Sequence, residues 1–145
     1  MFIVDVNVLL YAHDSDAPHH ERARGWLEGQ ITARAPLGLP WATIVAFLRL
    51  TTAARIWKIP WTTEQSIEAV AHLLSHRATF VAHTTSLHWQ LLGECISAGQ
   101  ARGNLVSDAH LAALAMEHGA TLVTFDRDFA RFRGLKQLNL LDVAA

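Results

Sequence analysis

Short apolar runs alternate along this chain with longer segments in which apolar residues recur at the spacing of a helix. The short runs predict strands at Phe2–Val4, Pro36–Pro40, Thr79–Ala82, Thr121–Thr124 and Leu138–Leu141. The longer segments predict helices after Asn7 and at His19–Gln30, Trp41–Arg55, Thr62 or Thr63 to about His76, Ser86–Ala98 and Leu105–His118. Strands that alternate with helices in one chain favour an α/β fold around a parallel sheet.

Capping residues and the absence of a linker complete this outline. Asn7 and Asn104 precede helical segments and are candidate N-caps, whereas Gly99 and Gly119 follow helical segments as stops. The 145 residues contain no internal repeat and no Gly/Ser-rich linker, and this length is sufficient for one core. We therefore expect a single domain over residues 1–145.

Four aspartates fall where such a fold would gather functional groups. In open parallel sheets, ligands bind beyond the carboxyl ends of the strands. Asp5 directly follows the first strand, and Asp126 and Asp128 follow the last β-branched strand, so they share one edge if these strands are parallel. Asp108 lies one turn after Asn104, near the start of a helix. Three distant segments can thus deliver carboxylates to one place.

Taken singly, each of these aspartates could be a helix cap or a turn former. Together they would repel one another and raise each other's pKa unless a cation neutralised them. Carboxylate oxygens are ligands that suit Mg²⁺ or Mn²⁺. A divalent metal site is therefore our hypothesis.

Three blocks of sequence resemble the signature segments of the PIN-domain ribonucleases. They are VDVNVLLYA at residues 4–12, GNLVSDAHLAALA at 103–115 and GATLVTFDRDF at 119–129. The similarity also includes the FLRL segment at 47–50, and it runs in order over almost the whole chain. It is closest to the VapC toxins of bacterial toxin-antitoxin pairs.

This resemblance implies a three-layer α/β/α fold and Mg²⁺-dependent endonucleolytic cleavage of RNA, of the tRNA or rRNA class, with Mn²⁺ as a possible substitute. By position, Asp5, Asp108 and Asp126 match the family's catalytic, metal-binding acids. Supporting polar residues are expected at Asn7, Thr124 and Asp128, and at Asn104, which shares a helix face with Asp108. The resemblance further implies a homodimer and inhibition by a VapB-like antitoxin.

One position departs from the family's pattern. Many VapC proteins carry a glutamate of the metal site directly before the Phe-Leu-Arg segment, and this chain has Ala46 there. Because a methyl group cannot ligate a metal, three consequences stay open. A second metal binds weakly, another acid serves, or the protein binds RNA or a partner without cutting. The replacement candidates are Asp14, Asp16, Glu21 and Asp128.

RNA binding would have to rely on local charge, because 12 Lys and Arg stand against 13 Asp and Glu in the whole chain. No acid lies between Glu28 and Glu64. This segment holds the RNA-binding candidates Arg49, Arg55 and Lys58, together with Arg34. A second basic group follows Asp126 and consists of Arg127, Arg131, Arg133 and Lys136.

The aromatic residues beside Lys58 allow two interpretations. Trp57 and Trp61 could stack on RNA bases. Alternatively, they pack in a core or a dimer interface, while Arg49 pairs with a buried acid.

The remaining signals concern location and rival chemistry. With Cys95 as its one cysteine, no positively charged leader and no apolar stretch long enough for a bilayer, the chain is expected to be cytoplasmic and without a membrane partner. A phosphatase of the haloacid-dehalogenase type would need a second acid where Asn7 stands. No histidine is assigned a catalytic role, and His110 falls off the helical face of Asp108.

Overall fold

Five parallel strands form the centre of the computed structural model, which describes residues 1–144. The strands are β1 (Phe2–Val4), β2 (Leu37–Pro40), β3 (Thr79–Ala82), β4 (Thr121–Thr124) and β5 (Gln137–Asn139). Their order across the sheet is β3-β2-β1-β4-β5, and every neighbouring pair is parallel. The predicted α/β class with a parallel sheet is confirmed.

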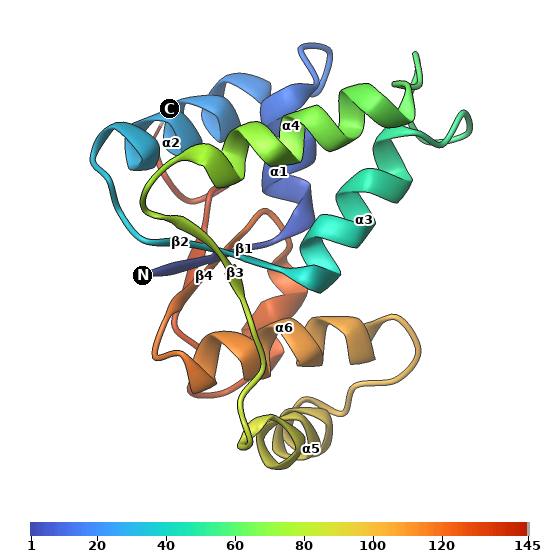
Figure 1. Cartoon of the computed structure of the whole chain (residues 1–145). Helices are drawn as coiled ribbons and strands as arrows, with labels where there is room; N and C mark the ends of the chain where they lie inside the picture. Colours follow the sequence, from blue (N-terminus) through green and yellow to red (C-terminus); the bar gives the residue numbers. More distant parts are fainter. Residues whose placement is uncertain (145) are drawn as a thin grey trace.

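Helices cover both faces of this sheet (Figure 1). One face carries α1 (Val6–His13), α2 (His20–Thr32), α3 (Trp41–Thr51) and α4 (Thr63–Ser75), and the other carries α5 (His88–Gly99) and α6 (Leu105–Glu117). Alternate strand residues serve the two cores, since Val4 and Val123 pack with the first group and Ile3 and Leu122 with the second. The three-layer α/β/α architecture is thereby confirmed.

The central strands bring two distant segments to one edge. β1 and β4 are in register, with Val4 opposite Val123. The backbone N–H of Asp5 donates to the carbonyl of Val123 at 3.0 Å. The residues that follow both strands, Asp5 on one side and Thr124 to Asp126 on the other, therefore lie side by side at the carboxyl end of the sheet.

Two helix boundaries near this edge differ from those expected. Asp5, not Asn7, is the N-cap of α1, because the Asp5 side chain accepts a hydrogen bond from the Val6 N–H. α3 ends at Thr51 instead of Arg55. There the Thr51 hydroxyl donates back to the Phe47 carbonyl, and the Thr51 carbonyl accepts from the Trp61 N–H, a tertiary contact that closes the turn after α3.

Three other expectations are also corrected. Gly99 is the last residue of α5, and Gln100 adopts the left-handed conformation that ends it, with φ of 49°. A Cβ on Gly99 would lie 2.7 Å from the Phe132 ring, so close packing requires glycine there. Asn104 is exposed and its side chain makes no capping hydrogen bond. The last strand covers Gln137–Asn139, shorter than predicted.

Across residues 1–144, no helix combines the length and apolar character required to span a bilayer.

Candidate metal centre

Asp5 is held at the end of β1 by three hydrogen bonds. Its Oδ1 accepts from the Val6 N–H at 2.7 Å, and its Oδ2 accepts from Asn7 Nδ2 at 2.9 Å and from the Thr124 hydroxyl at 2.7 Å. The residue is only 7% exposed, and this burial raises the pKa of its carboxyl despite the hydrogen bonds. The same aspartate thus caps α1 and presents a fixed, buried carboxylate.

The polar neighbours predicted from the sequence do contact Asp5. Thr124 Oγ1, which donates to Asp5, also accepts from the Asp126 N–H at 2.9 Å. Asn7 Oδ1 accepts from the Phe125 N–H at 3.2 Å. Two side chains therefore tie the start of α1 to the end of β4, and they fix the position of Asp5 relative to Asp126.

Three further carboxyl groups come together beside this network. Asp126 begins a short 3₁₀ segment (Arg127–Arg131), and its Oδ1 accepts from the Asp128 N–H at 2.8 Å. Asp108 comes from the first turn of α6. One oxygen each from Asp108, Asp126 and Asp128 lies within 4.8 Å of the others. Asp128, expected only as a supporting residue, thus joins the cluster, whereas Asp5 lies outside that separation.

The charges of all four aspartates nevertheless influence the pKa values within the site. The pKa of Asp108 is raised to about 6, first by burial and then by the charges of Asp126, Asp5 and Asp128, while Arg131 acts in the opposite direction. The charge of Asp126 also contributes to the raised pKa of Asp5. Mutual repulsion of this kind is what a bound cation would relieve.

The donor set fits a hard divalent cation. Three carboxylate oxygens, one from α6 and two from the segment after β4, converge without a sulfur or imidazole ligand among them, as Mg²⁺ and Mn²⁺ prefer. Asp126 uses Oδ1 for the Asp128 N–H, so its other oxygen is available as a ligand. The residues present can therefore hold such an ion.

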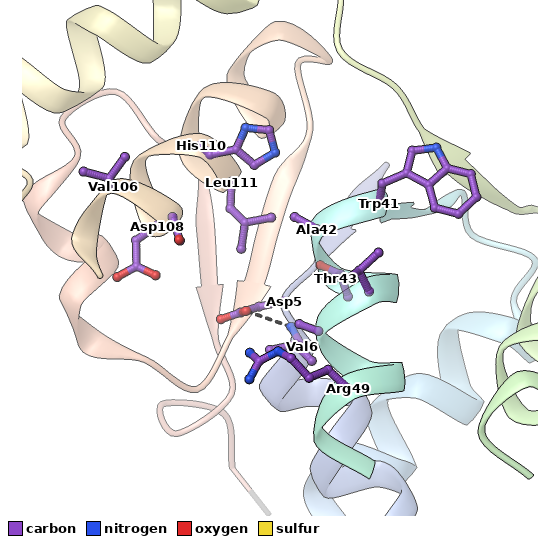
Figure 2. A pocket seen from close by; sticks show the side chains of 13 residues that line it. Asp5, Val6, Trp41, Ala42, Thr43, Arg49, Val106, Asp108, His110 and Leu111 are labelled. Carbon is purple, nitrogen blue, oxygen red and sulfur yellow. Dashed lines mark hydrogen bonds between the residues drawn. The ribbon is translucent and has the colours of Figure 1, made fainter. Parts of the chain in front are cut away.

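A groove of about 690 Å³ lies beside the acidic cluster, between α3 and α6 (Figure 2). Asp5 and Asp108 line it, and the Thr43 hydroxyl anchors α3 to the strand end by donating to the Val4 carbonyl at 2.8 Å. Ala46 lies in the same wall. The glutamate that the family pattern would place there is therefore missing from the groove itself.

Of the four acids considered as replacements for that glutamate, Asp128 is the one that reaches the cluster. Asp14 and Asp16 line a separate depression next to Lys58, and Glu21 lines another near His19. These three belong to other parts of the surface.

The RNA-binding candidates separate into two places. Arg49 is exposed, lines the groove and forms no ion pair within residues 1–144, so the expected alternative of a buried acidic partner is not seen. Arg55 and Lys58 are exposed in the segment between α3 and α4.

The two tryptophans near Lys58 pack against the protein. Trp61 contacts Phe47 with ring centroids 5.9 Å apart, and Trp57 contacts Trp61 at 5.6 Å. This favours the packing interpretation for Trp61. Among the second basic group, Arg127 pairs with Asp142 at 3.0 Å.

His110 was not assigned a role from the sequence, yet it lines the groove together with Asp108. Burial, and then the neighbouring His88, lower the pKa of His110. The helical spacing placed His110 off the face of Asp108, but the groove is wide enough for residues two apart on α6 to reach it.

Comparisons with known proteins agree with this geometry. The profile of the PIN domain family matches residues 2–135. Ribonuclease VapC43 of Mycobacterium tuberculosis is 40% identical over 142 residues, covering 98% of this chain and 97% of that protein. Ribonuclease VapC37 of the same species is 38% identical over 136 residues, or 94% of each chain.

Solved structures share the fold at lower sequence identity. VapBC2 from Rickettsia felis, bound to a DNA fragment from its promoter, aligns with a TM-score of 0.72 and 19% identity over 95% of this chain and 97% of that one. VapC20 of Mycobacterium tuberculosis, described as a sarcin-ricin loop cleaving toxin, aligns with a TM-score of 0.66 and 18% identity over 94% and 99%. With a family profile over most of its length and relatives 38% and 40% identical to it, the chain belongs to the PIN-domain family, among the VapC ribonucleases.

Proposed function

We propose that this protein is a divalent-metal-dependent endoribonuclease that acts as the toxin of a VapBC-type toxin-antitoxin pair. The observation that carries the proposal is the convergence of Asp5, Asp108, Asp126 and Asp128 at the carboxyl edge of the sheet. The names of the VapC ribonucleases to which the chain is related support RNA as the substrate. We place that RNA in the tRNA or rRNA class.

In this proposal the four aspartates bind Mg²⁺, with Mn²⁺ as a substitute. The bound ion would lower the pKa of a water molecule and neutralise charge on the scissile phosphate. Asn7 and Thr124 orient the Asp5 carboxylate through their hydrogen bonds to Oδ2. The Asp128 N–H orients Asp126 in the same way. Such contacts behind metal ligands typically change metal affinity or activity about 10- to 100-fold.

The RNA would be held by cations beside the acidic cluster. Arg49 lines the groove and would contact a phosphate close to the metal. Arg55 and Lys58, in the segment that follows α3, would contact phosphates further along the RNA. Because the net charge of the chain is only -1, these local contacts carry the attraction.

A VapB-like antitoxin and a second copy of this chain are the proposed protein partners. Support comes from structural neighbours that are toxin-antitoxin complexes, such as VapBC2 from Rickettsia felis and VapBC-1 from nontypeable Haemophilus influenzae.

A second candidate function follows from Ala46. Since this residue lines the groove where a further carboxylate would strengthen the site, the protein could bind RNA or a partner while cutting weakly or not at all. Membership of the PIN family weighs against the third possibility, a haloacid-dehalogenase-type phosphatase.

Cleavage mapping distinguishes these functions. The purified protein is incubated with total cellular RNA in Mg²⁺ or Mn²⁺, with Asp5→Asn as the control, and the new RNA ends are sequenced. We expect defined cuts that the variant does not make. RNA that is bound but left intact would support the binding module, and phosphate release from small esters would support the phosphatase.

A further inference from the structure

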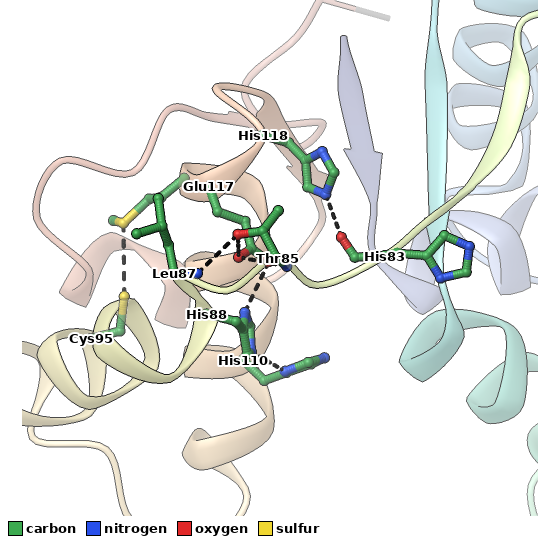
Figure 3. Close-up of polar contacts among 9 residues, drawn as sticks. His83, Thr85, Leu87, His88, Cys95, His110, Glu117 and His118 are labelled. Carbon is green, nitrogen blue, oxygen red and sulfur yellow. Dashed lines mark hydrogen bonds and ion pairs between the residues drawn. The ribbon is translucent and has the colours of Figure 1, made fainter.

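A chain of hydrogen bonds runs from the interior of the second helical layer to the groove (Figure 3). His88 Nδ1 donates to Glu117 Oε1 at 3.0 Å. His88 Nε2 and His110 Nδ1 are 2.8 Å apart and share a hydrogen bond. A carboxylate, a first imidazole and a second imidazole are thus connected in series.

The inner end of this chain is fixed by burial and by further hydrogen bonds. The Glu117 side chain is 0% exposed and that of His88 is 12% exposed. Glu117 Oε2 accepts from both the hydroxyl and the N–H of Thr85, at 2.8 and 3.2 Å. Both carboxylate oxygens are therefore in use, and the His88 ring is oriented by a group that cannot move freely.

The outer end of the chain lies in the groove of the metal centre. His110 on α6 lines this groove, which Arg49 on α3 also lines (Figure 2). Its Nδ1 is occupied by His88, whereas its Nε2 has no hydrogen-bond partner anywhere in the described chain, residues 1–144. The rings of His88 and His110 meet nearly at right angles, at 76° with centroids 4.7 Å apart. One nitrogen of a positioned ring is therefore available at the wall of the groove.

We propose that His110 is an RNA-positioning residue, whose Nε2 forms a hydrogen bond to a backbone phosphate of the RNA in the groove. The proposal rests on the proposed ribonuclease function and adds a second contact to RNA, besides that of Arg49, in the same groove. A phosphate requires a donor. With the His88 ring protonated on both nitrogens beside the Glu117 carboxylate, His88 Nδ1 donates to Glu117 and His88 Nε2 donates to Nδ1 of His110. The proton of the His110 ring is then carried by Nε2 and can be donated to a phosphate oxygen. Contacts of this kind fix the register of a nucleic acid without reading its sequence.

A purely structural role does not account for the position of His110. Glu117 already ties α6 to the segment before α5 through Thr85 and to the start of α5 through His88. His110 adds only a second link between α6 and α5, to the same His88 ring that Glu117 already holds. What it adds is an oriented donor at the wall of the groove.

Two substitutions of His110 test the roles of its two ring nitrogens separately. An asparagine at position 110 reaches about as far as Nδ1 and can keep the bond to His88, whereas a glutamine reaches about as far as Nε2 and can keep the bond to RNA. We expect His110→Asn to retain thermal stability and to raise KM for RNA about tenfold, as for one lost hydrogen bond, with a much smaller change in kcat. We expect His110→Gln to lose stability yet keep KM closer to that of the native protein.

His88→Gln tests whether the hydrogen bond from His88 orients the His110 ring. This variant should raise KM several-fold, because the His110 ring loses its fixed orientation. In all three variants, Mg²⁺ affinity measured by calorimetry should stay at the native value. A fall in Mg²⁺ affinity would mean that His110 acts through the metal and would overturn the proposal.

The outcomes also separate this proposal from the ribonuclease function. If the native protein fails to cut RNA in Mg²⁺, the proposed function fails. If the native protein cuts and His110→Asn cuts with an unchanged KM, the ribonuclease function stands and the role of His110 is refuted.

Discussion

The Thr124 hydroxyl donates a 2.7 Å hydrogen bond to Asp5 Oδ2, although the two residues are 119 positions apart in the chain. The same hydroxyl oxygen accepts the N–H of Asp126 at 2.9 Å. One side chain at the end of β4 thus sets the relative positions of two of the four carboxyl groups.

Thr124→Val should therefore weaken metal binding more than it weakens the fold. Valine keeps the approximate shape but removes these two hydrogen bonds and a third, from Asn7 Nδ2, so we expect Mg²⁺ affinity to fall about 10- to 100-fold. The free energy of unfolding without metal should fall by about 1 to 2 kcal/mol. Calorimetric titration with Mg²⁺ and urea unfolding measure the two effects. Thr124→Ser keeps the hydroxyl and should restore the affinity; native affinity in the valine variant would contradict the assigned role.

Asp108→Asn should stabilise the metal-free protein in a pH-dependent way. Burial, Asp126 and Asp5 raise the pKa of Asp108 from the usual 3.8 to about 6. Such a group destabilises the folded state above the raised pKa, and this penalty disappears as the pH falls to the unfolded value. We expect the variant to gain about 1 to 2 kcal/mol at about pH 8, after allowance for solvent screening, and little at about pH 4.

Urea unfolding of both proteins in EDTA measures that gain. In excess Mg²⁺ the order of stability should reverse, because the native protein gains the free energy of metal binding. A difference between the two proteins that does not change with pH would rule out repulsion among the carboxyl groups as its cause.

Ala46→Glu should strengthen the metal centre. Ala46 lines the groove together with Asp5 and Asp108, so a glutamate there can offer the carboxylate that the family pattern contains. We expect higher Mg²⁺ affinity and faster RNA cleavage, measured with a labelled RNA. Ala46→Gln has the same size without the charge and should gain neither. If the two variants behaved alike, the absent glutamate would not limit this site.

Substitutions of Arg49, Arg55 and Lys58 should lower the salt dependence of RNA binding more than substitution of an ordinary surface arginine. Each phosphate contact removed should reduce the slope of log K against log salt concentration by about 0.7 for single-stranded RNA. We expect this reduction for Arg49→Gln and about twice as much for the double variant at Arg55 and Lys58. Arg24→Gln is the control, because Arg24 already pairs with Glu28 at 2.7 Å. Slopes equal to the control would favour a packing role.

The positions of the strands and of Asp5 and Asp126 could be predicted because both follow from local pattern. Apolar runs such as Phe2–Val4 define the strands, and parallel pairing then brings their carboxyl ends to one edge. The end of α3 could not be predicted, since it depends on the Trp61 N–H reaching the Thr51 carbonyl, and no helical spacing shows that contact.

Two features of the site were also underestimated from the sequence. Asp128 reaches Asp108 because Asp126 caps the segment that carries it, a turn that the Asp-Arg-Asp spacing at 126–128 could have indicated. His110 was set aside on helical geometry alone. Its contact with His88 joins α6 to α5, and only the tertiary structure shows that pairing.

The account depends most on the claim that the acidic cluster supports RNA cleavage by means of a divalent cation. The most direct test is the rate of RNA cleavage as a function of Mg²⁺ concentration, for the native protein and for Asp108→Asn. The account predicts saturable activation of the native protein, loss of cleavage in EDTA, and a rate reduced at least about 100-fold in the variant at every Mg²⁺ concentration. Cleavage that persists in EDTA, or an Asp108→Asn variant as fast as the native protein, would contradict it.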